Sequence, residues 1–130
     1  MTNTNTSTTG TGEVASRYIE LVGAHDLDAL DVLLADSLVA TTVSAAFDKA
    51  EWIVALGRLL PVLVRNEIRQ VVVDGTTACV VYDFVTDTEA GAVPCAEWIT
   101  VDADGRITGI NLLFEKTNWG QVAAAIQARS

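Results

Sequence analysis

Two carboxyl residues, Asp83 and Glu97, stand within otherwise apolar, strand-like stretches of the sequence. If a three-residue loop over 89–91 joins the two stretches, alternation along the strands puts Asp83 directly opposite Glu97 on one sheet face. Burial and like charge both favour the protonated form of a carboxyl, so at least one of the pair is expected to carry a proton near neutral pH. A protonated carboxyl can donate a hydrogen bond to an oxygen on which negative charge develops.

A buried phenol and an amide are predicted to lie close to these carboxyls. Tyr18 belongs to an apolar stripe with helical spacing and therefore points into the protein. A two-residue turn at 74–75 aligns Asn66 with Asp83, which gives the apolar surface a polar patch. The patch has two interpretations. It is a site for a substrate oxygen, or it is a structural group in which Asp83 and Glu97 bond only Asn66, the backbone or water.

The rest of the same sheet face is apolar. A two-residue turn at 104–105 aligns Glu97 with Leu112, between two further apolar residues of the last strand. We therefore predict a mostly apolar pocket for a small molecule. The residues expected to line it around the two carboxyls are Asn66, Val81, Ile99, Ile110, Leu112 and Phe114.

The opposite face of these strands is expected to be apolar as well. Its side chains would be Val80, Tyr82, Phe84, Trp98 and Leu113. Such a surface is too apolar to remain in water, so one face of the sheet should meet helices and the other a second subunit. The sequence thus predicts a symmetric homodimer formed through the outer sheet faces.

Helix signals precede the strands. Apolar residues at helical spacing predict a first helix from Glu13 to Gly23 and a second, short one that ends near Ala35. Asp48 and Glu51 have the spacing of a capping box, which predicts the start of a third helix that ends before the proline at position 61.

Turn signals divide the remainder into strands. A short strand is expected between the second and third helices, four strands should follow as an antiparallel meander, and a final helix should close the chain near Ala128. The predicted strands are 38–43, 62–73, 76–88, 92–103 and 106–117. Together the elements predict an α+β fold in which helices pack on a curved, mainly antiparallel sheet.

Composition limits the partners. The chain has 130 residues, of which half are hydrophobic, and this length suits one domain with one core. No stretch approaches the roughly 18 consecutive apolar residues of a membrane span. The formal net charge of −9 would repel phosphate backbones and anionic lipid headgroups, so we expect neither nucleic acid nor membrane as a partner.

The start of the chain and the cysteines indicate the compartment. Residues 1–12 are rich in Thr, Asn, Ser and Gly and lack the features of a secretory signal, so we expect a disordered tail followed by one domain over residues 13–130. Cys79 and Cys95 fall in predicted strands and form no metal-ligand pair with His25. We interpret both as buried free thiols, with no metal or cofactor implied, and expect a cytoplasmic location.

Several segments resemble the ketosteroid isomerases of the nuclear transport factor 2-like, or SnoaL-like, superfamily. The opening segments are Arg17-Tyr18-Ile19-Glu20-Leu21-Val22 and His25-Asp26-Leu27-Asp28-Ala29-Leu30, and the closing ones are Pro94-Cys95-Ala96 and Asp102-Ala103-Asp104-Gly105-Arg106-Ile107. The likeness covers roughly residues 14–119. It implies a cone-shaped sheet with the N-terminal helices on its concave face and a pocket inside.

The resemblance also implies roles for particular residues. Members of that family hold a dienolate oxygen with a tyrosine and a protonated aspartate, and Tyr18 and Glu97 match these two positions. The family's proton-shuttling base would fall at Thr42, whose hydroxyl is far too weak an acid for that role. Leu56 stands near the place of a supporting tyrosine, so Thr42 and Leu56 are expected to line the pocket. In epoxide hydrolases of the same superfamily a partner acid occupies the place of Leu112.

Three functions follow from these expectations. In the first, an isomerase- or cyclase-like enzyme without a cofactor uses Asp83 as its base, while Glu97 and Tyr18 stabilise an oxyanion. In the second, the pocket binds a steroid-, polyketide- or terpenoid-like molecule through one carbonyl or hydroxyl without turnover. In the third, the domain serves only for dimerisation.

Overall fold

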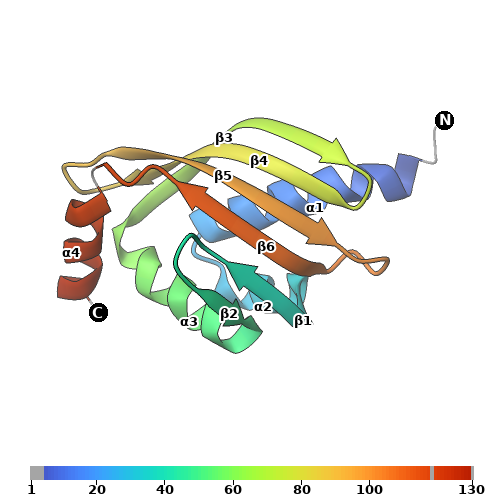
Figure 1. The fold of residues 1–130 in the computed structure, drawn as a ribbon, viewed down its shortest axis with the longest axis horizontal. Helices are drawn as coiled ribbons and strands as arrows, with labels where there is room; N and C mark the ends of the chain where they lie inside the picture. Colours follow the sequence, from blue (N-terminus) through green and yellow to red (C-terminus); the bar gives the residue numbers. More distant parts are fainter. Residues whose placement is uncertain (1–4, 118, 130) are drawn as a thin grey trace.

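A computed structural model describes residues 5–117 and 119–129 of the chain. Six strands form one curved, unclosed sheet in the order β2-β1-β6-β5-β4-β3, and helices cover one of its faces (Figure 1). In chain order the elements are α1 (Asn5–Gly23), α2 (Leu27–Leu33), β1 (Leu34–Thr41), β2 (Ala46–Asp48), α3 (Lys49–Leu59), the 3-10 turn η1 (Leu60–Val62), β3 (Leu63–Asp74), β4 (Thr77–Thr86), β5 (Ala92–Val101), β6 (Ile107–Phe114) and α4 (Trp119–Arg129). Among the strands of the described residues only β1 and β6 pair in parallel, which confirms the predicted α+β class with a mainly antiparallel sheet.

The helix α1 lies across β3, β4 and β5. Its buried apolar side chains recur at helical spacing and are Ala15, Tyr18, Ile19 and Val22. The helix begins at Asn5, earlier than the predicted start at residue 13. The Thr11 hydroxyl donates to the Gly75 carbonyl (3.0 Å) and so ties this earlier part of the helix to the β3–β4 turn. Residues 1–4 of the expected tail lie outside the described residues.

The start of α3 confirms the predicted capping box. The Asp48 carboxylate accepts from the Glu51 N–H (2.9 Å), and the Glu51 carboxylate accepts from the Asp48 N–H (2.9 Å). The rings of Phe47 and Trp52 pack beside the cap with centroids 5.2 Å apart. Pro61 follows in η1, as expected for a residue that a helix interior does not tolerate. These contacts fix the direction in which α3 presents Trp52.

The segment between α2 and α3 differs from the prediction. The backbone becomes extended at Leu34, so β1 begins earlier than residue 38 and α2 is shorter than expected. The strand β2 pairs with the end of β1 and was not predicted, because its three residues are too few for alternation to be visible.

The strands β3 to β6 form the predicted antiparallel meander. A glycine in the left-handed region lies in the β3–β4 and β5–β6 turns and directly after the β4–β5 loop, with φ of 61° at Gly75, 78° at Gly105 and 62° at Gly91. Glycine adopts this region without the steric cost that a Cβ brings, which is why these positions were recognisable as turns. The register of β5 and β6 also confirms the prediction, since Glu97 pairs with Leu112.

The register of β4 and β5 is not the predicted one. Asp83 pairs with Pro94, and Glu97 pairs with Val80. The pairing differs from the expected one by an odd number of residues, which reverses the sheet face of every side chain on one strand relative to the other. The prediction that Asp83 faces Glu97 is therefore wrong, and the two carboxyls lie on opposite faces of the sheet.

The loop between β4 and β5 explains the error. The Thr86 N–H donates to the Gly91 carbonyl (2.9 Å), so the loop comprises residues 87–90 rather than 89–91. The Thr86 hydroxyl donates to the same carbonyl (2.8 Å) and bonds the Thr88 hydroxyl (2.7 Å). These local side-chain bonds close the wider loop.

The register of β3 and β4 is shifted by one residue from the predicted one. Asn66 pairs with Phe84, whereas Glu67 pairs with Asp83, so the prediction that Asn66 lies beside Asp83 is wrong. Two features produce the shift: the turn residues are 75–76, and the ladder is irregular between Ile68 and Gln70. As a result Asn66 faces inward.

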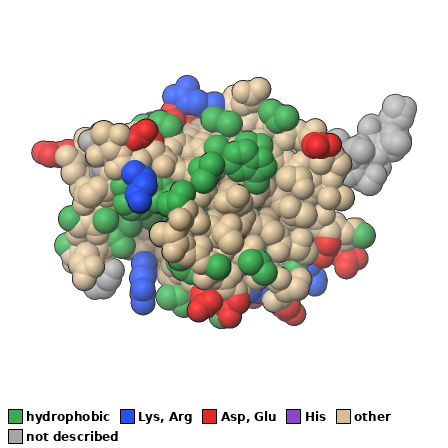
Figure 2. All heavy atoms as spheres, in the orientation of Figure 1, with side chains coloured by type: hydrophobic (Ala, Val, Ile, Leu, Met, Phe, Trp, Pro, Cys, Tyr) green, Lys and Arg blue, Asp and Glu red, His purple; other side chains and the backbone are tan. Residues whose placement is uncertain are grey.

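The two faces of β4 are exchanged relative to the prediction. Val80, Tyr82 and Phe84 point to the concave, helix-covered side. On the outer face Trp98 and Leu113 are 41% and 39% exposed, as the sequence led us to expect. Hydrophobic side chains gather on this face in Figure 2. Both cysteines are free, Cys95 buried and Cys79 only half-buried.

Candidate functional site

The concave sheet face and the helices enclose a cavity of about 310 Å³. The helices α1 and α3 supply its walls opposite the sheet, and α4 lies at the end of the sheet remote from the β5–β6 turn (Figure 1). The predicted site residues that line the cavity are Tyr18, Thr42, Leu56, Asn66, Glu97, Leu112 and Phe114.

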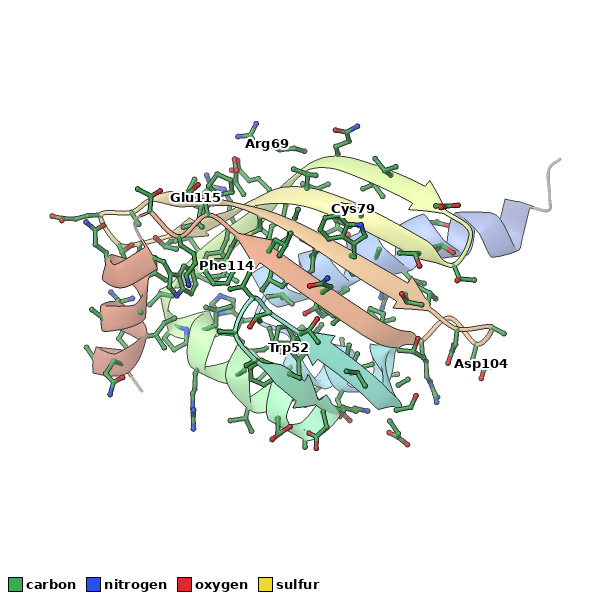
Figure 3. The ribbon with its side chains drawn as sticks, viewed as in Figure 1. Trp52, Arg69, Cys79, Asp104, Phe114 and Glu115 are labelled. Carbon is green, nitrogen blue, oxygen red and sulfur yellow. The ribbon has the colours of Figure 1, made fainter. Side chains whose placement is uncertain are left out.

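Four predicted site residues do not line the cavity. Ile99 and Ile110 are on the concave side but belong to the closed core. Val81 and Asp83 lie on the outer face. Asp83 accepts a hydrogen bond from Arg69 Nε (2.7 Å), and Arg69 extends away from the helices (Figure 3). Asp83 is therefore a buried partner in an ion pair on the outer face and cannot reach a molecule in the cavity.

Glu97 is the carboxyl residue of the cavity wall. Its side chain is 2% exposed, and Oε1 accepts a hydrogen bond from the Tyr82 hydroxyl (2.6 Å). The other oxygen, Oε2, is buried without a hydrogen-bond partner among the described residues. Buried polar atoms without a hydrogen-bond partner from the protein are uncommon, and most of them bond a water molecule or have a functional role.

Tyr18 is held by a residue of α3. Trp52 Nε1 donates to the Tyr18 hydroxyl oxygen (2.9 Å), and both side chains are buried. Indole N–H is a donor only, so the Tyr18 hydroxyl accepts this bond and can donate its own proton, with the Glu97 carboxyl as its neighbour. Tyr18, Trp52, Tyr82 and Glu97 together are called the polar cluster below.

The polar cluster shifts the ionisation of its members. Burial raises the pKa of Glu97 to about 7, although the hydroxyls of Tyr82 and Tyr18 act in the opposite direction by stabilising the charged form. Burial, followed by the nearby charge of Glu97, raises the pKa of both Tyr18 and Tyr82 well above the usual value. Near neutral pH the two tyrosines are therefore neutral donors, and Glu97 is divided between its acid and its ionised form.

Asn66 adds a second polar point to the wall. Its Nδ2 donates to the Ile19 carbonyl (3.0 Å), while its Oδ1 is buried without a hydrogen-bond partner among the described residues. Thr42 also lines the cavity, but its hydroxyl oxygen accepts from the Ser44 N–H (3.3 Å) in the β1–β2 turn. Burial raises the pKa of the Cys95 thiol to about 12, which makes it unreactive.

The remaining lining is mostly apolar and aromatic. Trp119 of α4 packs against Phe114 and Phe84, with ring centroids 4.5 Å and 6.3 Å apart. Over residues 5–117 and 119–129 no group of three or more His, Cys, Asp or Glu side chains could hold a metal ion. The arrangement can thus bind an apolar body and offer hydrogen bonds to it at a few points.

Sequence reasoning missed two members of the polar cluster. Tyr82 was assigned to the outer face because of the β4–β5 register. Trp52 was not among the predicted site residues, because nothing in its spacing indicated a bond to Tyr18. The helical stripe of α1 was sufficient to place Tyr18, and the turn at 104–105 was sufficient to place Leu112 next to Glu97.

A protein-family model described as "SnoaL-like domain" matches residues 15–110. The chain belongs to the SnoaL-like family. This SnoaL-like domain has the nuclear transport factor 2-like fold that its sequence resembled, and a search of curated proteins found no match to it.

Solved structures share the fold of this SnoaL-like domain. A protein from Kribbella flavida is 26% identical, with a TM-score of 0.80 over 92% of this chain and 98% of that chain. A steroid delta-isomerase from Pseudomonas aeruginosa is 16% identical, with a TM-score of 0.72 over 92% and 90% of the two chains. An epoxide hydrolase from M. tuberculosis is 18% identical, with a TM-score of 0.72 over 95% and 98%. Identities this low in the two enzymes establish a shared fold alone.

Within the described residues, no helix of this SnoaL-like domain combines the length and the hydrophobicity that crossing a membrane requires.

Proposed function

We propose that this SnoaL-like domain binds a small, mostly apolar molecule and holds one oxygen of that molecule with Glu97 and Tyr18. The observation that carries the proposal is the unpartnered Oε2 of Glu97, buried in the wall of an apolar cavity. Protonated Glu97 offers an O–H at this point, and a carbonyl or hydroxyl oxygen is the partner that would satisfy it.

The size and lining of the cavity support a compact, largely hydrocarbon ligand. About 310 Å³ lies at the lower end of the range of roughly 300–1,000 Å³ usual for ligand pockets. A steroid-, polyketide- or terpenoid-like skeleton has few polar atoms, which suits a wall with so few polar groups. The unpartnered Oδ1 of Asn66 would accept from a second, donor group on the ligand.

A second function, proton transfer on a carbonyl substrate, is favoured by one observation. The pKa of about 7 gives Glu97 comparable amounts of acid and base near neutral pH, which is the condition for efficient general acid–base catalysis. Since Asp83 lies on the outer face and Thr42 carries no carboxyl, Glu97 itself would take the proton from the carbon beside the carbonyl and return it. Tyr18 would then donate to the oxyanion.

The two functions require opposite forms of Glu97. Binding uses the protonated form as a donor, so affinity should fall by about tenfold or more between pH 5.5 and pH 8.5, as the competent fraction falls. Proton transfer uses the ionised form, so the turnover rate should rise over the same range. A panel of cyclic ketones, enones and phenols would be screened by thermal shift at both pH values, because a bound ligand raises the melting temperature.

Glu97→Gln and Asp83→Asn form a matched pair of carboxyl-to-amide variants. Glu97→Gln should weaken binding at pH 5.5 and abolish any turnover, since an amide is the poorer donor and is not a base. Asp83→Asn should change neither, because Asp83 lies outside the cavity. Ligand binding that is independent of pH and unchanged in Glu97→Gln would refute the proposed role of Glu97.

A further inference from the structure

Arg58 is the basic residue of the cavity wall. Among the described residues that line the cavity, no other Lys or Arg is present. The α3 positions that line the cavity with it are Trp52, Ala55, Leu56 and Leu59, and Arg58 flanks this apolar stripe beside Ala55. Its side chain is exposed, whereas the polar cluster is buried, so Arg58 lies at the rim and the polar cluster at the inner end.

The Arg58 guanidinium has no hydrogen bond or ion pair with a described residue. By contrast, Lys49, Arg65, Arg69 and Arg129 each pair with a carboxylate. Arg58 stands in the last turn of α3, where a positive charge also suits the helix dipole. The dipole accounts for a cation in that turn, but it does not require the cation to be on the side that faces the cavity.

Charge and geometry indicate which kind of ligand would extend from Arg58 at the rim of the cavity to the polar cluster at its inner end. Trp52 and Arg58 are six residues apart on α3, or about 9 Å along the helix axis. A guanidinium presents a planar set of donors that matches a carboxylate in geometry. The chain's net charge of −9 repels anions in general, so a local cation at the rim would have to provide any preference for an anionic ligand.

We propose that the ligand of this cavity is an amphipathic acid, with its oxygen at the polar cluster, its apolar body along α3 and its carboxylate on Arg58. This inference rests on the proposed binding of an oxygen by Glu97 and Tyr18, and it adds the chemical class of the ligand. Arg58 sets specificity for the acid and takes no part in proton transfer.

The test uses a rigid, fluorescent probe, 6-hydroxy-2-naphthoic acid, whose hydroxyl and carboxylate lie at opposite ends. Its methyl ester is the neutral counterpart with the same body. At pH 6 and low salt the wild-type protein should bind the acid about tenfold more tightly than the ester, because a charge-assisted hydrogen bond replaces a neutral contact. Fluorescence titration gives both dissociation constants.

Arg58→Gln should remove the preference for the acid and leave the affinity for the ester unchanged. Arg17→Gln makes the same change of charge at an exposed position of α1 outside the cavity, and it should retain the preference. Arg58→Lys should retain part of the preference, since an ammonium keeps the charge without the planar fork. Added salt should weaken the binding of the acid more than that of the ester.

The results separate the inference from the proposed function. If the ester binds and Glu97→Gln weakens its binding, but the acid binds no more tightly than the ester, the inference is wrong and the proposed function stands. The inference is also wrong if Arg58→Gln retains the preference for the acid. If neither probe binds at millimolar concentration, or if Glu97→Gln leaves the binding of both unchanged, both proposals are overturned.

Discussion

Glu97 is buried at a position where its ionised form is poorly solvated. One of its oxygens accepts from Tyr82 and the other has no partner among the described residues. A structural carboxyl would normally have both oxygens satisfied, because a half-satisfied buried group destabilises the fold. The unsatisfied oxygen of Glu97 is therefore the observation on which the proposed ligand contact at the polar cluster rests.

The raised pKa of Glu97 predicts how stability changes with pH. The folded-state pKa of about 7 lies above the unfolded value of 4.5, so the folded protein binds this proton more tightly than the unfolded chain does. The contribution of Glu97 to the free energy of unfolding should thus be largest below pH 4.5 and should fall as the pH rises to about 7. Glu97→Gln removes this pH-dependent decrease in the free energy of unfolding, while the amide oxygen of the glutamine can still accept the Tyr82 hydrogen bond.

Glu97→Gln should therefore be more stable than the wild type at pH 8.5, by roughly 1–3 kcal/mol, and equally stable near pH 4.5. Urea unfolding at several pH values measures the difference. Glu89→Gln, at an exposed loop position, is the control and should show no such trend. A difference between Glu97→Gln and wild type that is the same at every pH would contradict the raised pKa.

At the scale of the elements, the end of α1 and the start of β3 approach each other closely. A Cβ on Gly23 would come within 2.9 Å of the backbone nitrogen of Asn66, so only glycine fits without movement. The same approach brings Asn66 Nδ2 to the Ile19 carbonyl of α1. One close backbone contact thus positions Asn66 in the wall and, through α1, Tyr18.

Gly23→Ala should separate α1 from β3 and lower the free energy of unfolding by about 1–3 kcal/mol, the usual cost of overpacking. Gly120→Ala in α4 is the matched control, since a Cβ there meets nothing within 4 Å and alanine favours a helix. Urea unfolding of both variants tests the contact. Equal stability of Gly23→Ala and wild type would show that the elements are not held at this distance.

The elements also show what the sequence can and cannot predict. Helical stripes, the capping box and turn glycines are local signals, and they predicted the order of the helices and of every strand except β2, and placed Tyr18. The place of Leu56 in the pocket was expected from the family resemblance. The sheet face on which a side chain lies depends on the strand register. An error in the length of one loop therefore assigns every side chain of the next strand to the wrong face. Hydrogen bonds of Thr86 close the loop at 87–90. In the resulting register Asp83, which was predicted to lie in the site, is on the outer face, and Tyr82, which was predicted to lie on the outer face, is in the site. Alternation alone contains no information about such bonds.

At the scale of the whole molecule, no element formed by residues 5–117 and 119–129 covers the outer sheet face. Trp98 lies between Cys79 and Asn111 across the strands, and Leu113 lies beside Ala96. Large exposed side chains on one face of a sheet are typical of an interaction surface. We propose that two copies of the chain associate through this face, as the sequence predicted.

Charge determines how the dimer should be tested. Each chain has a net charge of −9, so two copies repel each other at low salt, and the hydrophobic contact must exceed this repulsion. Sedimentation at tens of micromolar should therefore show a dimer whose dissociation constant decreases as NaCl rises from about 20 to 500 mM, where the Debye length shortens to a few ångströms.

Trp98→Glu should produce monomers at both salt concentrations, because it buries a carboxylate in the interface. Val32→Glu, at a 70% exposed position of α2, makes the same kind of change away from the sheet and should leave the dimer intact. A wild-type protein that is monomeric even in 500 mM NaCl would exclude association through the outer face, since repulsion would no longer oppose the contact.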